Sequence, residues 1–159
     1  MKAASLKEIQ TELENLSIKD LTSLCLRLGK FKKENKELLT YLLFESFDEQ
    51  AYIENVKQEI NLQMDAINLS SLYFVKKSSR KRLRMISKYA RYTDSLVAEI
   101  QWLIHFCGAL KACPISIRDS QALLNLYTGQ IKKIDKLLKG MHEDLQYDFI
   151  KQIKTLSLD

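Results

Sequence analysis

The sequence predicts an all-α protein, a compact bundle of seven or eight helices. Three observations support this fold class: apolar residues recur at helical spacing along nearly the whole chain, no window alternates with a period of two, and the 159 residues include one proline and four glycines. With 46% hydrophobic residues, the chain is long enough to bury a core, which excludes a disordered protein. We expect a single domain over residues 1–159, with a weak subdivision near residue 70.

The first third of the chain predicts three helices. Ser5 and Glu8 form a capping box, in which a hydroxyl and a carboxylate three residues apart satisfy free amides at a helix start. A second helix follows Ser17 and ends at Gly29, because glycine adopts the left-handed conformation of a helix end at little cost. The third, over residues 33–47, is apolar on more than one face, so we expect it to be the most buried helix.

Two long helices are predicted in the middle of the chain. Asp48 caps the first, whose apolar stripe runs from Ile53 to Ile67. Residues 69–72 either break this helix or continue it into the next one. The second helix spans about residues 71–91.

The last third predicts three further helices. Residues 93–95 offer a cap for a helix that ends before Pro114, because proline lacks the amide hydrogen that a helix needs. Ser116 begins the next helix, which ends near Gly140. A last helix carries the apolar residues between 145 and 153.

Cysteine usage and hydropathy predict a cytoplasmic protein. The three cysteines are an odd number, whereas a secreted domain usually pairs an even set. The first residues contain no apolar run that would form a signal-peptide core. The longest charge-free stretch in the most apolar region covers only residues 100–110, and about 20 apolar residues are needed to cross a bilayer. We therefore expect no membrane span.

The positive charge is concentrated in one segment. The chain carries 25 basic and 20 acidic residues, a net charge of +5. Residues 1–65 hold 9 basic and 12 acidic residues, residues 66–92 hold 8 basic and none acidic, and residues 93–159 hold 8 of each. The segment in the middle therefore has a net charge of +8, more than the excess of the entire chain.

Residues 71–92 predict a basic amphipathic helix. At about 100° per residue, five of its cations fall within an arc of about 80°, and an apolar seam lies roughly 140° away. We call these five residues the basic ridge: Lys77, Arg80, Arg84, Lys88 and Arg91. Further basic and aromatic residues flank the basic ridge: Lys76, Lys81, Arg82, Tyr89 and Tyr92, with Tyr73 and Phe74 near its start. Like charges at helical spacing repel each other, so folding alone would favour interleaved glutamates, which this helix lacks.

Basic stripes attract polyanions, so we interpret the protein as a non-catalytic interaction module whose basic ridge binds an acidic protein or nucleic acid. The flanking aromatic residues would then stack on unpaired bases, or they belong to the core. The alternative is a structural scaffold that forms a homo-oligomer, in which acidic helices of the same chain or of a partner subunit neutralise the ridge. Its contact surface would be a heptad-like seam: Ile131, Ile134, Leu138 and Met141.

The sequence shows no catalytic or metal-binding constellation, so we expect no enzyme, no metal and no cofactor. His105, Cys107 and Cys113 are close in sequence, but residues two or six apart on one helix face different directions. Glycine-rich phosphate loops and the Gly-x-Ser-x-Gly nucleophile motif are absent from the sequence. An enzyme without a recognisable motif is a further alternative, which requires a pocket where His105 or clustered carboxylates converge.

One stretch resembles known sequences. Residues 24–45, LCLRLGKFKKENKELLTYLLFE, resemble a pattern of small, uncharacterised all-helical bacterial proteins, a resemblance that transfers no function. Residues 16–43 also resemble the helix-turn-helix of SAP-type DNA-binding modules in the placement of their leucines, but lack the glycine-containing loop of that family. The residues themselves indicate a helical hairpin with a basic tip, and a solvated turn is the simpler interpretation of those charges.

Overall fold

The computed structural model describes residues 2–158 and contains, in that range, eight α-helices and no strand. It confirms the predicted all-α fold class and the expected number of helices. The chain divides into two compact units, residues 1–45 and residues 46–159. Residue 70, where the sequence suggested a subdivision, lies inside the second unit, and the single domain stays a prediction.

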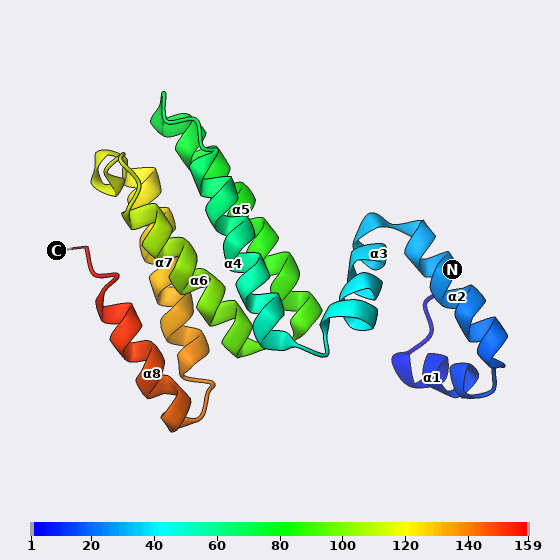
Figure 1. The fold of residues 1–159 in the computed structure, drawn as a ribbon. Helices are drawn as coiled ribbons and strands as arrows, with labels where there is room; N and C mark the ends of the chain where they lie inside the picture. Colours follow the sequence, from blue (N-terminus) through cyan, green and yellow to red (C-terminus); the bar gives the residue numbers. More distant parts are fainter. Residues whose placement is uncertain (1, 159) are drawn as a thin grey trace. The chain divides into compact units, whose positions relative to one another are not determined.

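The first unit contains three short α-helices and one π-helical turn, drawn in blue and cyan in Figure 1. Their bounds are α1 Leu6–Glu14, α2 Ile18–Phe31, α3 Lys33–Thr40 and the turn η1 Tyr41–Glu45. α1 begins with the predicted capping box: the Ser5 hydroxyl accepts a 3.3 Å hydrogen bond from the Glu8 amide, and the Glu8 carboxylate accepts one of 2.7 Å from the Ser5 amide. The bonds that the Ser5 amide and hydroxyl donate to the Glu8 carboxylate favour its charged form and lower the pKa of Glu8.

Gly29 does not end the second helix, so that prediction was wrong. α2 continues to Phe31, and Gly29 does not adopt a positive φ. A Cβ atom at Gly29 would lie 3.1 Å from the Cδ1 atom of Leu39, on α3. The glycine therefore permits the close approach of α2 and α3, rather than a change of backbone direction.

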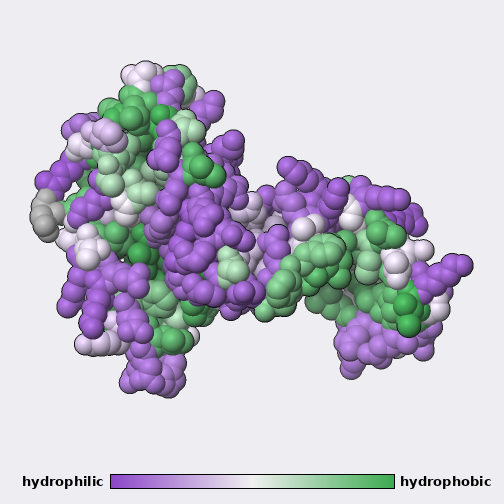
Figure 2. Space-filling view, in the orientation of Figure 1, coloured by the Kyte–Doolittle hydropathy of each residue, from purple (hydrophilic) through white to green (hydrophobic). Residues whose placement is uncertain are grey.

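The expectation that residues 33–47 form the most buried helix was also wrong. Tyr41 is buried, but Leu43 and Phe44 are 67% and 66% exposed, and no side chain of α1, α2 or α3 is buried. A unit of this size has too few helices to cover every face of an apolar segment. Figure 2 shows hydrophobic side chains on the surface of this unit.

The second unit contains five longer α-helices and one short 3₁₀-helix (Figure 1). Their bounds are α4 Glu49–Asp65, α5 Leu72–Thr93, α6 Leu96–Lys111, η2 Ile117–Asp119, α7 Gln121–Leu138 and α8 Glu143–Lys154. α6 is the central element, because it packs against α4, α5 and α7. Within residues 2–158, no helix is both long and apolar enough to span a membrane.

Among the described helices, α6 contains the most buried residues. Half of its 16 residues are buried: Ala98, Ile100, Trp102, Leu103, Ile104, Phe106, Cys107 and Leu110. The Trp102 indole donates a 3.1 Å hydrogen bond to the carbonyl oxygen of Ile53 on α4, which satisfies its only polar atom inside the core. Residues 100–110, the longest charge-free stretch of this apolar region, therefore belong to a core helix.

Polar residues set the boundaries of these helices. Asp48 and Ser95 cap α4 and α6 as predicted, each accepting a hydrogen bond from a backbone amide of the first turn. Residues 66–71 form a non-helical connection between α4 and α5. Ser116 begins only the 3₁₀-helix η2, not the long helix predicted from it, because the extended backbone at Ser120 (φ −139°) separates η2 from α7.

Candidate functional site

The basic segment forms α5, a continuous helix of 22 residues. One side of α5 packs into the second unit through Val75, Ser79, Arg82 and Ile86. The basic ridge occupies the opposite side. From Lys77 to Arg91, the ridge spans about 21 Å at a rise of about 1.5 Å per residue.

The basic ridge is accessible to solvent. Lys77, Arg80, Arg84 and Arg91 are exposed, and Lys88 is half-buried. The Lys88 ammonium lies 5.1 Å from the ring centroid of Tyr89, a cation–π distance. The structure therefore places all five predicted ridge residues along one face of one helix.

Four of the ridge residues form no ion pair within residues 2–158: Lys77, Arg80, Arg84 and Arg91. Two carboxylates on the neighbouring α4 have other partners. Glu54 pairs with Lys57 at 2.7 Å, and Glu59 accepts a 3.2 Å hydrogen bond from the hydroxyl of Tyr89. These four cations are therefore left without a direct counter-charge in the described chain.

The flanking residues separate into two groups. Lys81 is exposed and Lys76 is half-buried, so both extend the positive surface around the ridge. Arg82 is 5% exposed and lies on the packed side of α5, where its Nε atom has no hydrogen-bond partner. Burial disfavours its charged form and lowers the pKa of Arg82. The fully buried hydroxyl of Ser79, one turn earlier, also has no partner.

Tyr89, one of the two flanking tyrosines, anchors α5 to α4. The Tyr89 hydroxyl binds Glu59, and its ring meets Tyr52 edge-on with centroids 6.3 Å apart. The ring centroids of Tyr92 and Tyr89 are 6.1 Å apart. This arrangement supports the core interpretation of Tyr89 rather than base stacking. At the other end of the helix, Tyr73 and Phe74 are exposed.

His105, the best catalytic candidate in the sequence, lies in a small polar cluster. Its Nε2 atom is 2.7 Å from the side-chain oxygen of Asn61, and burial, followed by the nearby charge of Lys57, lowers the pKa of His105. Burial raises the pKa of the Cys107 thiol to about 12, which leaves it protonated and a poor nucleophile. No group of three His, Cys, Asp or Glu side chains in residues 2–158 is placed to hold a metal ion.

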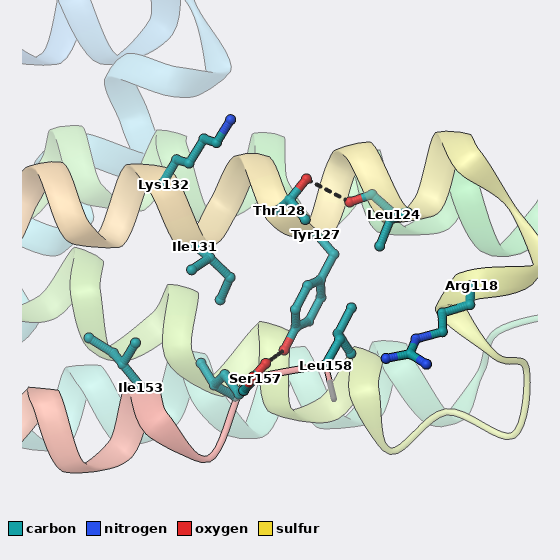
Figure 3. A pocket seen from close by; sticks show the side chains of 10 residues that line it. Arg118, Leu124, Tyr127, Thr128, Ile131, Lys132, Ile153, Ser157 and Leu158 are labelled. Atoms are coloured by element: carbon teal, nitrogen blue, oxygen red, sulfur yellow. Dashed lines mark hydrogen bonds between the residues drawn. The ribbon is translucent and has the colours of Figure 1, made fainter.

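The structure shows one feature that the sequence did not reveal, an apolar groove of about 870 Å³ between α7 and the C-terminal segment (Figure 3). Its walls include Leu124, Ile131 and Ile153. The heptad-like seam of α7 had indicated an oligomer surface, but Ile134 and Leu138 are buried inside the second unit. The seam thus contributes to the fold of one chain, and Ile131 contributes to the groove.

Two surfaces of the second unit are candidates for function because of their geometry and charge. Among the described residues, the basic ridge is a strongly charged surface and the groove beside α7 is an apolar concavity. No protein family matches the chain, and neither a curated protein nor a solved structure shows significant similarity to it.

Proposed function

We propose that the protein binds the phosphate backbone of nucleic acid through the basic ridge of α5. The observation that carries this proposal is the row of exposed arginines and lysines, four of which have no counter-charge in the described chain. A polyanion supplies those counter-charges, and the release of its condensed counterions drives binding. The ridge is the basic stripe along one helix that characterises many nucleic-acid-binding proteins.

Nucleic acid is favoured over an acidic protein because residues 77–91, which carry the ridge, expose no apolar anchor; the exposed aromatic residues Tyr73 and Phe74 lie before the ridge begins, at the start of α5. No large hydrophobic side chain between residues 77 and 91 is exposed. Protein interfaces usually centre on aromatic or aliphatic anchors and contain few charged residues at that centre. Contacts to phosphates are mainly electrostatic and need no such anchor.

Binding through the ridge is expected to be independent of base sequence. Lysine and arginine contacts to phosphates position a protein on nucleic acid without reading the bases. Tyr89 and Tyr92 are half-buried and pack against other side chains, so we assign no base stacking to them, and the exposed Tyr73 and Phe74 precede the ridge. We therefore expect similar affinities for oligonucleotides of equal length and different sequence.

A salt titration tests the proposal. With five phosphate contacts, the logarithm of the association constant for duplex DNA should fall with the logarithm of salt concentration with a slope of about −4.5. Replacing three ridge residues by alanine, Lys77→Ala, Arg80→Ala and Arg84→Ala, should weaken binding and reduce that slope by about three. Alanine favours helix, so circular dichroism should show unchanged helicity.

A matched control uses exposed lysines on α7 and at its C-cap. Lys132→Ala, Lys136→Ala and Lys139→Ala remove the same charge from another part of the second unit and should leave the slope unchanged. An equal loss in both triple variants would show that net charge alone drives binding. If the chain bound polyglutamate more tightly than an oligonucleotide of equal charge, the partner would be an acidic protein instead.

A second candidate function, a homo-oligomeric scaffold, is favoured by the apolar surface of the first unit. Ile18 and Phe31 of α2 are 84% and 76% exposed, which suggests that another surface covers them. The candidate surface therefore belongs to residues 6–44 rather than to α7. Sedimentation equilibrium over a wide concentration range tests this candidate, and a monomer at every concentration would argue against it.

A further inference from the structure

The groove beside α7 has the composition of a small-molecule site. α7 supplies one wall through Leu124, Tyr127 and Ile131, and the C-terminal segment supplies the other through Ile153 and residues 156–158. Its volume of about 870 Å³ lies within the range of about 300–1,000 Å³ that is typical of ligand pockets. Figure 3 shows these apolar side chains facing one another across the groove.

Hydrogen bonds hold the second wall in place. The Tyr127 hydroxyl donates to the carbonyl oxygen of Leu156 at 2.6 Å. The Lys111 ammonium donates to the carbonyl oxygens of Thr155 and Ser157, at 3.0 and 2.6 Å. Three bonds thus fasten the segment that follows α8, so the groove is formed before a ligand arrives and its binding costs less ordering.

One cation is placed to receive the polar end of a ligand. The Arg118 side chain, from η2, extends toward Leu158 at the end of the groove (Figure 3), and it forms no ion pair within residues 2–158. Lys132 also lines the groove, but its ammonium points away from the apolar walls. A guanidinium binds a carboxylate through two parallel hydrogen bonds, which makes Arg118 the natural contact for a carboxylate head group.

We infer that this groove binds a single-chain amphiphilic carboxylate, such as a free medium- or long-chain fatty acid, with its hydrocarbon chain on the apolar walls and its carboxylate on Arg118. A peptide fits less well, because the groove offers few partners for buried backbone amides. The Thr128 hydroxyl is already bonded to the carbonyl oxygen of Leu124 at 2.9 Å. This site is separate from the basic ridge and does not depend on nucleic-acid binding.

Calorimetric titration of the full chain with a series of carboxylates, below their micelle concentrations, tests the inference. From octanoate to dodecanoate, affinity should increase about fourfold per added methylene, the effect of burying one methylene group. Dodecanol should bind at least about tenfold more weakly than dodecanoate, because it makes no charged hydrogen bond with Arg118. Arg118→Ala should abolish that difference, and the control Lys136→Ala, an exposed lysine of α7 outside the groove, should preserve it.

The position of the ligand is tested separately. Thr128→Trp should fill the groove and abolish dodecanoate binding, while amide spectra verify that the variant is folded. In the unmodified chain, dodecanoate should shift the amide resonances of residues 118–132 and 153–158. Changes in amide resonances confined to residues 6–44 would overturn the inference. So would binding of the protein to anionic phospholipid vesicles but not to free dodecanoate. The triple alanine variant of the ridge should bind dodecanoate normally even if it loses nucleic acid.

Discussion

The hydroxyl of Tyr127 donates a 2.6 Å hydrogen bond to the carbonyl oxygen of Leu156, 29 residues later in the chain. Both residues are buried, so neither polar atom has easy access to water. This one bond connects the middle of α7 to the segment that follows α8. It therefore links the order of the C-terminal segment to the core of the second unit.

Tyr127→Phe should release this segment. The substitution leaves the carbonyl of Leu156 without its donor, so we expect a loss of about 1–3 kcal/mol in the free energy of unfolding. Amide hydrogen exchange at residues 155–158 should accelerate more than exchange in α6. Thr128→Val is the control, because the Thr128 hydroxyl bonds only within its own helix, to Leu124 and Asn125. Unchanged exchange at residues 155–158 in Tyr127→Phe would contradict the role of this bond.

Trp102→Phe should destabilise the second unit. Trp102 is fully buried, it donates to the carbonyl of Ile53, and its ring meets Tyr52 edge-on at 5.9 Å. Loss of the donor and of part of the ring should cost about 2–4 kcal/mol. Urea unfolding followed by circular dichroism measures the effect. The exposed Tyr73 provides a comparison, since Tyr73→Phe should change stability by less than about 0.5 kcal/mol.

Arg82→Met should stabilise the protein. Arg82 is buried, and its Nε atom has no partner among the described residues. Methionine fills similar space with a flexible apolar chain and removes the cost of burying an N–H donor without a partner. We expect the free energy of unfolding to rise by about 1–3 kcal/mol. A decrease would show that the guanidinium has a partner in solution, and Arg82→Ala, which opens a cavity, should be destabilising in either case.

The first unit should exchange its amide hydrogens much faster than the second. None of the side chains of α1, α2 or α3 is buried, whereas α6 buries half of its residues. Helices that bury little apolar surface open locally at low free-energy cost. Hydrogen exchange at neutral pH should therefore show low protection at residues 6–40 and high protection in α6. Equal protection in the two would indicate that a partner or a second copy covers the first unit.

Structural features that depend on a few neighbouring residues could be predicted from the sequence. The caps at Ser5, Ser17, Asp48 and Ser95 all form as predicted, because a cap involves only a side chain and an amide two or three residues away. The basic ridge was predictable for the same reason, since its geometry depends only on the helical repeat. The grouping of Arg82 with the residues that flank the ridge was wrong, because the same repeat places it about 160° from the centre of the ridge, on the packed side of α5.

Structural features that depend on contacts between distant segments could not be predicted from the sequence. Residues 33–47 are apolar enough for a core, but periodicity does not show whether another helix covers them, and the structure leaves most of them exposed. Gly29 resembled a helix end, yet its role depends on the approach of Leu39 from α3. The groove requires α7 and residues 156–158 to lie side by side, a placement set by bonds from Lys111 and Tyr127.

The protein should lose stability in alkali because two buried acids resist ionisation. Burial raises the pKa of Cys107 from 9.0 to about 12, and burial together with Cys107 raises that of Tyr127 from 10.0 to about 12. Both groups ionise more easily in the unfolded chain. Their contribution to stability is therefore complete below about pH 9 and is lost progressively as pH rises from about 9 to about 12.

Cys107→Ala separates the cysteine contribution from the titration of other groups. We expect the stability loss between about pH 8 and about pH 11 to be smaller in this variant by about 2–3 kcal/mol, because lysines titrate equally in both proteins. Urea unfolding monitored by the fluorescence of Trp102, the single tryptophan, measures both stabilities. The exposed Cys25 is the control: the stability of Cys25→Ala should decline with pH as that of the unmodified protein does. Identical declines in all three proteins would show that the Cys107 thiol ionises as readily in the folded chain as in the unfolded one.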